Sequence, residues 1–244
     1  MNKKLTMALT AVISASLPQA ALAEGSSWGS LQNSPVEDNN VIGTLYGEKS
    51  WPVWQGSGGL KASPFISGTL VHDEDGNFWN NKVTLRAGGK LSYPAGPATF
   101  TLRAGAAHEH LYKSGDSYSA PFVSAEYWVG WGFGTSMPGS SWGVVGNISP
   151  SEKGNTIGML YGKQGFLAFN AGKGRVTPFV DGTFARDSKG YDWNNKEVYG
   201  LGVEYVHPFG DGSFSVGIKH QEERRKTSRG SGAVLSLTYW VPLK

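Results

Sequence analysis

The sequence predicts an all-β fold, an antiparallel up-and-down transmembrane β-barrel of about 10–12 strands. Two observations carry this prediction. Long segments alternate polar and apolar residues with a period of two, most clearly over residues 82–93. Glycine is frequent, with 35 residues, and aromatic residues make up 12% of the chain. Glycine is poor in helices and aromatic residues favour strands, so extended structure is expected throughout.

A tandem repeat organises the chain. Trp79-Asn80-Asn81-Lys82 recurs 114 positions later as Trp193-Asn194-Asn195-Lys196. Matching Pro, Gly and Phe positions flank both tetrapeptides, and the alternation that follows keeps the same phase. A one-residue slip would turn every side chain to the other face, so the shared phase marks a repeated β unit. We expect two copies of this unit, over residues 41–135 and 156–244.

The first residues predict an export signal. Two lysines at positions 3 and 4 precede an apolar run that ends near Leu17. Ala21-Leu22-Ala23 then supplies a small-x-small cleavage pattern. We therefore expect residues 1–23 to be a bacterial signal peptide and Glu24 to begin the mature chain.

The remaining composition narrows the class of protein. Residues 24–40 are rich in Ser, Gly and Asn and are expected to form a flexible segment before a single barrel over residues 41–244. The chain has no cysteine, so an exported protein of this size must rely on packing and hydrogen bonds. Its 22 basic and 19 acidic residues show no clustered basic face, which argues against nucleic acid as a partner.

The lengths of the expected strands favour a membrane barrel. They run roughly 9–14 residues, longer than the ~5–6 of soluble sheets and close to the ~9–11 that cross a bilayer. Tight turns at 94–97 and 209–212 alternate with longer polar connections at 113–119 and 223–232. Tyr and Trp near the strand ends suit an interfacial girdle. The alternative is a soluble periplasmic β-sandwich that binds saccharide, in which the apolar faces form a shared core.

A family resemblance accompanies these patterns. Leu45-Tyr46-Gly47-Glu48, Ser63-Pro64-Phe65, an acidic turn and Trp79-Asn80-Asn81-Lys82 follow one another before a Gly-containing alternating strand. This order resembles the C-terminal barrel-like domain of bacteriophage adsorption protein A and related outer-membrane components of exopolysaccharide export. The resemblance implies an outer-membrane location and a role in surface polysaccharide secretion or as a receptor. The periplasmic helical repeat region of the larger family members has no counterpart in this sequence.

The polar faces of the strands supply candidate lumen residues. These are Lys82, Arg86, Lys90, Arg103, Glu126, Lys196, Glu204 and Lys219. Because most of them are basic, an open lumen would favour anionic solutes such as an anionic polysaccharide. The alternative is that the charges pair with one another and fill a narrow barrel. The sequence leaves both alternatives open.

The repeated tetrapeptide supplies the candidate saccharide contacts. Trp79 and Trp193 are candidates to stack on a sugar ring, with Asn80 and Asn194 as hydrogen-bonding partners. The other interpretation is structural, because Asn suits a turn and Trp anchors a strand at the membrane interface. Duplication at equivalent positions favours the structural interpretation.

Two further clusters of residues resemble functional sites. His108 and His110 share a strand face and are the candidates for a metal or hydrolytic site in a lipid- or glycan-modifying enzyme. Asp73, Asp75 and Asn77 resemble a calcium loop but lack the frame and terminal Glu of an EF-hand, so an acidic turn is expected. We predict no catalytic residue, no metal site and no cofactor.

The sequence thus predicts a barrel of the bacterial outer membrane without enzymatic activity. We expect it to pass or bind a surface polysaccharide, or to serve as an accessory barrel in that pathway. Expected partners are outer-membrane lipid, lipopolysaccharide, an anionic polysaccharide and other secretion components. The periplasmic sandwich and the histidine enzyme are the alternatives.

Overall fold

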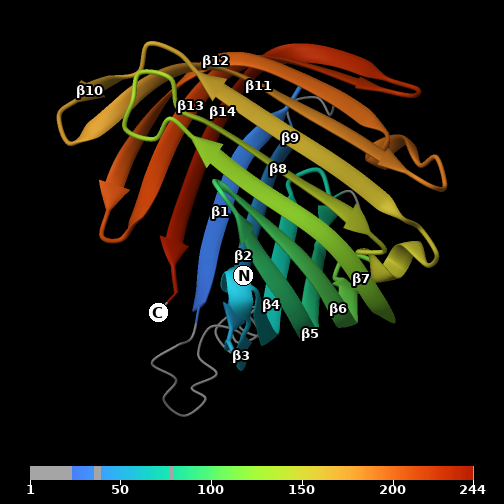
Figure 1. Cartoon of the computed structure of the whole chain (residues 1–244). Helices are drawn as coiled ribbons and strands as arrows, with labels where there is room; N and C mark the ends of the chain where they lie inside the picture. The colour runs from blue at the N-terminus through green and yellow to red at the C-terminus, as the bar shows by residue number, and fades with distance from the viewer. Residues whose placement is uncertain (1–23, 36–39, 77–79, 244) are drawn as a thin grey trace.

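The computed structural model describes residues 24–35, 40–76 and 80–243, which form a closed antiparallel barrel (Figure 1). The long strands are β1 (Glu24–Ser34), β2 (Asn40–Ser50), β4 (Lys61–Asp73), β5 (Lys82–Ala95), β6 (Ala98–Leu111), β7 (Asp116–Trp131), β8 (Gly139–Gly146), β9 (Ile157–Gly165), β11 (Gly174–Asp187), β12 (Lys196–Phe209), β13 (Gly212–Arg225) and β14 (Arg229–Pro242). Each pairs with the next, and β14 pairs with β1, so these 12 strands close up-and-down.

Short elements occupy the connections. β3 (Trp54–Gln55) and β10 (Phe169–Ala171) extend the sheet beside β4 and β11. The described residues include the 3₁₀ turns η1 (Ser57–Gly59), η3 (Pro150–Glu152) and η4 (Asp192–Asn194). Within the described residues, no helix is long and apolar enough to cross a bilayer. The predicted signal peptide, residues 1–23, lies outside them.

The prediction of a flexible segment over residues 24–40 is wrong for most of that segment. Its residues Glu24–Ser34 form β1, which pairs with β2 along its whole length and closes the barrel against β14. The small residues that suggested flexibility make room for neighbouring side chains. A Cβ on Gly29 would lie 2.3 Å from the Tyr239 ring and 2.8 Å from the side chain of Leu45. Glycine in this strand therefore serves packing rather than disorder.

The alternation has the predicted phase and excludes the sandwich. Along β5, Thr84 is buried inside the barrel, whereas Leu85 and Leu91 are exposed on the outer wall. Large apolar side chains are exposed around the whole circumference, including Leu31, Leu102, Val123, Leu160, Leu201, Ile218 and Leu235. A soluble sandwich would bury this set in its core. An exposed apolar wall around a closed sheet is the arrangement that a lipid bilayer requires.

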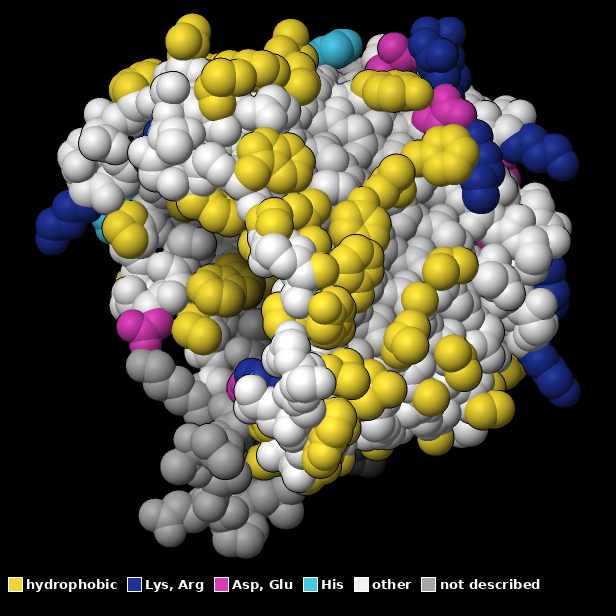
Figure 2. All heavy atoms as spheres, in the orientation of Figure 1, with side chains coloured by type: hydrophobic (Ala, Val, Ile, Leu, Met, Phe, Trp, Pro, Cys, Tyr) yellow, Lys and Arg dark blue, Asp and Glu magenta, His cyan; other side chains and the backbone are white. Residues whose placement is uncertain are grey.

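The two ends of the barrel differ in character. Ser26 pairs with Pro242, so both termini lie at one end, together with tight turns at Gly96 and Gly210 (φ 59° and 56°). Short turns are typical of the periplasmic side, and we call this end the inner end. The opposite, outer end carries charged side chains on the wall, such as the Arg186–Glu197 ion pair at 2.6 Å. Figure 2 shows such charges along the edge where the β8–β9 and β11–β12 connections lie in Figure 1.

The outer connections are shorter than predicted. The polar segments expected at 113–119 and 223–232 are reduced to residues 112–115 and 226–228, because β6, β7, β13 and β14 continue into them. Polar residues in these stretches reflect exposure to water rather than loop structure.

The two halves pair in equivalent registers. Val71 pairs with Lys82 between β4 and β5, and Ala185 pairs with Lys196 between β11 and β12, 114 positions later. Inward-facing Trp28 and Tyr46 stack at 5.8 Å between ring centroids, and Trp142 and Tyr161 repeat this stack at 5.9 Å. Such agreement is what a duplicated unit requires, and the duplication itself stays a prediction of the sequence.

A membrane band predicts a depth-dependent penalty for charge on the outer wall. Ile218 lies near the middle of β13 and is exposed there. We expect Ile218→Arg to cost about 2–4 kcal/mol, whereas Tyr93→Arg beside the inner tight turn costs about 0–1 kcal/mol. Equilibrium unfolding in lipid vesicles measures both. Equal penalties at the two positions would contradict the proposed band.

Candidate functional site

The middle of the lumen in the first half holds a network of paired charges. Glu48 on β2 accepts from Lys90 at 2.8 Å and from Arg103, and Tyr46 donates to it at 2.7 Å. Arg103 also pairs with Glu126 at 3.3 Å. Glu48, Lys90 and Arg103 are largely buried. Pairing lowers the cost of placing these charges in a low-dielectric interior.

The second half of the lumen also pairs its buried charges, with the acid and the base exchanged between equivalent positions. Lys163 and Glu204 pair at 2.5 Å and occupy the positions equivalent to Glu48 and Lys90. Lys163 also lies 4.2 Å from the centroid of the Phe179 ring. Nearby, Lys219 pairs with Asp181 at 2.8 Å. The pairing, rather than the sign at either position, is what both halves share.

A second level of pairs lies nearer the outer end. Lys82 pairs with Glu109 at 3.2 Å, and the equivalent Lys196 lies 3.9 Å from Glu223. Glu223 accepts a shorter bond from Arg225 at 2.7 Å. The lysines that end the two tetrapeptides therefore point into the lumen, each beside a buried carboxylate.

Aromatic rings fill much of the remaining interior of the first half. Phe65 and Phe122 meet edge to face at 6.2 Å, and each is only 2% exposed. Arg103 lies 5.4 Å from the centroid of Phe65, and Arg86 lies 6.0 Å from that of Phe122. Arg86 also donates to the carbonyl of Ile148 at 2.8 Å, which ties the 147–156 connection into the lumen. These contacts favour a filled barrel over an open channel.

All eight predicted lumen residues lie on the inner face. Arg86 bonds a backbone carbonyl, and the residues that form ion pairs are Lys82, Lys90, Arg103, Glu126, Lys196, Glu204 and Lys219. Sequence reasoning missed the acidic partners Glu48, Glu109, Asp181 and Glu223, which come from other strands. Their charge offsets the basic excess in the middle of the lumen, so the expected field for anionic solutes is weakened there.

A cavity of about 240 Å³ lies at the outer end, and we call it the outer chamber. Both tetrapeptides contribute to it: Asn80 and Lys82 from the first, and Trp193, Asn194 and Lys196 from the second. Gln221, Glu223 and Arg225 of β13 line it as well, together with the apolar residues Ile42, Val71, Ile157 and Met159. The chamber thus combines an aromatic ring, amides, both signs of charge and apolar side chains.

The second tetrapeptide holds its own turn in shape. Asp187 accepts from the Asn195 side chain at 2.8 Å and from the backbone amide of Gly190 at 2.5 Å. Trp193 stacks on Tyr191 at 4.8 Å between centroids. These contacts support the structural interpretation of the tetrapeptide.

The same side chains also meet the 147–156 connection. Trp193 donates through Nε1 to Glu152 at 3.2 Å, and Asn194 donates to the other oxygen of Glu152 at 2.7 Å. Trp193 and Asn194 are thereby held in place where they line the outer chamber. A structural role and a ligand-contacting role are therefore compatible at these positions.

The first tetrapeptide forms an equivalent turn. Asp73 accepts from Asn81 at 2.9 Å and from the amide of Gly76 at 2.5 Å, so Asp73 anchors an acidic turn, as predicted. Tyr112 donates to the carbonyl of Val71 at 2.8 Å, and burial, with a smaller contribution from the charge of Asp73, raises the pKa of Tyr112 to about 12. Trp79 lies outside the described residues.

The histidine pair faces away from the lumen. His108 and His110 lie on the outer wall, where they bond Ser119 and Ser117 at 2.9 Å each, while Glu109 between them points inward. Among the described residues, no group of three or more His, Cys, Asp or Glu side chains is placed to hold a metal ion. The pair therefore does not contribute to the outer chamber.

Tryptophan placement corrects part of the predicted girdle. By the alternation of their strands, Trp28, Trp128, Trp142 and Trp240 face the lumen near the inner end rather than the lipid. Trp128 shares its face with Glu126, whose partner Arg103 lies inside. The girdle retains outward residues such as Tyr93, Phe100 and Tyr239. The inner half of the lumen is thus lined with indole rings.

Comparisons with known proteins agree with this architecture. No family model and no curated protein matches the chain. An outer membrane channel from Pseudomonas putida F1 is 9% identical, with 94% of this chain and 98% of that chain covered and a TM-score of 0.50. The β domain of the Bordetella autotransporter Brka is 15% identical, with 91% of this chain and 99% of that chain covered and a TM-score of 0.44. LpxR from Salmonella typhimurium is 8% identical, with 88% of this chain and 99% of that chain covered and a TM-score of 0.43.

The comparisons support the fold and nothing narrower. None of the three is a bacteriophage adsorption protein, and the Pseudomonas putida channel, at 9% identity, shows a likeness of fold alone. The closed ladder and the exposed apolar wall identify a membrane-spanning β-barrel, located in the bacterial outer membrane.

The central charge network predicts a large cost when its acid is removed. Glu48→Gln leaves Lys90 and Arg103 without their shared buried partner. We expect a loss of about 3–5 kcal/mol in unfolding free energy. Glu222→Gln, which breaks exposed pairs with Arg224 and Arg229, should leave the unfolding free energy nearly unchanged. Denaturant titrations in lipid measure both, and a Glu48→Gln cost as small as that of Glu222→Gln would refute the network.

Proposed function

We propose that this outer-membrane barrel binds a surface saccharide in the outer chamber and carries out no chemistry. The convergence of both tetrapeptides on one cavity is the observation that carries the proposal. Trp193 offers an indole face, while Asn80, Asn194 and Gln221 offer amides for sugar hydroxyls. A small cavity with apolar side chains and a few convergent polar groups suits a ligand of this class.

The charges that line the chamber favour an acidic sugar. Lys82, Lys196 and Arg225 contribute three positive charges, against two negative charges from Glu152 and Glu223. The Lys196–Glu223 separation of 3.9 Å is longer than an ordinary charged hydrogen bond. A uronic-acid carboxylate can therefore join Lys196 without displacing a tight ion pair.

The filled interior supports binding rather than passage. Phe65, Phe122 and the paired charges occupy the middle of the lumen between the chamber and the inner end. Within a surface polysaccharide pathway, the protein would therefore act as a binding or accessory barrel. Its arginine-bearing outer rim, with Arg186 and Arg224, is suited to lipopolysaccharide phosphates.

Saccharide binding is tested by removing the indole. We expect Trp193→Ala to weaken binding of an acidic oligosaccharide by about tenfold, because an apolar contact and the order of Asn194 are lost together. Titration calorimetry on the barrel in lipid nanodiscs measures the affinity. Trp54→Ala, an exposed indole near the inner end, is the matched control. Equal affinities for Trp193→Ala and unaltered protein would remove the chamber as the site.

Conductance separates binding from passage. Planar bilayers holding the unaltered protein should show no steady ion current, because side chains fill the lumen. Phe65→Ala with Phe122→Ala removes the central rings and should produce a current. A steady current through the unaltered protein, lowered by substitution of Arg86 or Arg103, would instead favour passage.

A further inference from the structure

Two seams of the barrel, β14–β1 and β7–β8, share an unusual closure. In the β14–β1 seam, the backbone ladder ends at Gln32–Ser236, although β14 continues to pair with β13 as far as Arg229. In the β7–β8 seam, the ladder ends at Ser124–Gly146, although β7 begins at Asp116. In the described residues, each long strand thus extends beyond its partner toward the outer end.

One asparagine side chain closes each seam above its ladder. Asn33 accepts from the amide of Leu235 at 2.8 Å and donates to the carbonyl of Ala233 at 2.9 Å. Asn147 repeats these bonds, accepting from Val123 at 2.7 Å and donating to Pro121 at 3.0 Å. A side-chain clip can open by a rotamer change, whereas a ladder opens only by separating strands.

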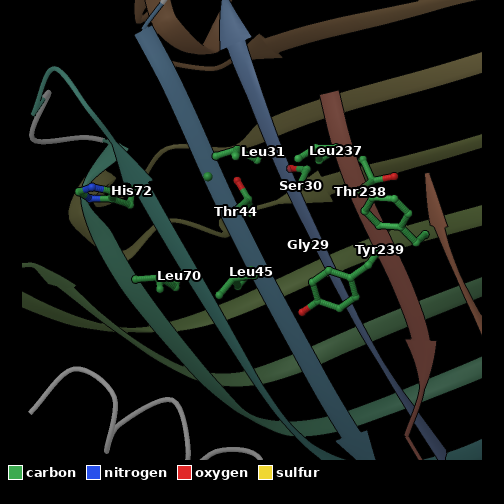
Figure 3. A pocket seen from close by; sticks show the side chains of 12 residues that line it. Gly29, Ser30, Leu31, Thr44, Leu45, Leu70, His72, Leu237, Thr238 and Tyr239 are labelled. Carbon is green, nitrogen blue, oxygen red and sulfur yellow. The ribbon is translucent and has the colours of Figure 1, made fainter. Parts of the chain in front are cut away.

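Two cavities of opposite character lie back to back at the β14–β1 seam. Inside, Gln32, Asn33 and Ser34 line the outer chamber. Outside, an apolar groove of about 290 Å³ crosses β14, β1, β2 and β4, with Leu31, Leu45, Leu70, Leu237 and Tyr239 around Gly29 and Gly43 (Figure 3). Adjacent residues of one strand serve both, because Gln32 faces the chamber and Leu31 faces the groove. A single strand layer therefore separates a polar site from a membrane-facing one.

The other seam lacks this combination. Its outer wall carries an equivalent groove that includes Gly143, Gly158 and Leu160. On its inner side, however, the 147–156 connection folds into the lumen. The carbonyl of Ile148 accepts from Arg86, and Ser151 donates to Glu109. The second groove touches the outer chamber only through β9, whose Met159 lines both, and no residue of β7 or β8 lines the chamber. Of the two seams in the described residues, only the β14–β1 seam has chamber-lining residues on the strand whose ladder ends early.

We propose that the β14–β1 seam admits a lipid-linked saccharide, with its sugar in the outer chamber and its chain in the apolar groove. The sugar half of this inference rests on the function proposed for the chamber. The ligand crosses the wall beside Asn33, where a clip replaces the ladder. This route lets the chain stay in hydrocarbon, since drawing each methylene out of the bilayer lowers occupancy by a factor of about four.

A disulfide across the seam tests the route. Continuing the β14–β1 register brings Ser34 opposite Val234, and the natural chain has no cysteine to interfere. Ser34→Cys with Val234→Cys would lock the seam on oxidation. Ser27→Cys with Val241→Cys, at positions that are already paired in the ladder and line neither cavity, is the control. Binding of dodecyl glucuronide and of methyl glucuronide is measured in nanodiscs, oxidised and reduced.

We expect oxidation of the seam pair to weaken dodecyl glucuronide binding by at least about 100-fold, because the chain must then leave the bilayer. Methyl glucuronide should bind the oxidised and the reduced seam pair with equal affinity, and reduction should restore binding of dodecyl glucuronide. The oxidised control pair should bind both dodecyl glucuronide and methyl glucuronide. If the oxidised seam pair binds both dodecyl glucuronide and methyl glucuronide, the proposed route through the seam is wrong, whereas saccharide binding in the outer chamber is retained. If neither ligand binds the unaltered protein, both proposals fail.

The paired asparagines supply an independent test. Asn33→Ala should speed association of dodecyl glucuronide at least about threefold, because the clip no longer holds the seam closed. Asn147→Ala removes the same two bonds from the other seam and should leave the rate unchanged. Equal effects of the two substitutions would overturn the assignment of the route to the β14–β1 seam.

Discussion

Closure of the backbone ladder is the constraint on which the rest of this structure depends. Inside a bilayer no water is available for unpaired amides and carbonyls, so the sheet must return to its first strand. β1 provides that return by pairing with β14 and β2. Once the sheet is closed, alternate side chains have only two destinations, lipid or lumen. The exposed leucines and the buried charges of the same strands, such as Leu91 and Lys90, follow from this single requirement.

Closure also determines how the lumen is filled. The alternation directs some charged side chains into the lumen, away from bulk water. Such charges are stable only when they pair with side chains from neighbouring strands. Glu48 with Lys90, and Lys163 with Glu204, meet that need with opposite signs at equivalent positions. Together with the phenylalanines, these pairs fill the middle of the barrel. The open polar volume is thereby concentrated in the outer chamber, beside the seam whose ladder ends early.

Local periodicity predicted much of this architecture, and its failures have physical causes. The phase of β5, β6, β12 and β13 was visible because each is long and regularly alternating. β1 was missed because its serines and glycines look like linker residues, and only the packing of Tyr239 against Gly29 explains them. Phe65 and Phe122 interrupt polar faces, so no alternation rule reveals that they meet inside the lumen. The Asn33 and Asn147 clips lie at strand ends, where asparagine is common for other reasons.

The sequence by itself determined the all-β class, the phase of most strands and the set of basic residues that face inward. These properties depend on the alternation of side chains along a single strand, so the residues that decide them lie close together in the sequence. Only the tertiary structure decided which acid each base meets, that the two tetrapeptides share one chamber, and that a groove lies behind it. Those relations join residues that can be 200 or more positions apart, such as Asn33 and Ala233. Barrel closure brings them together, and no local pattern encodes that distance.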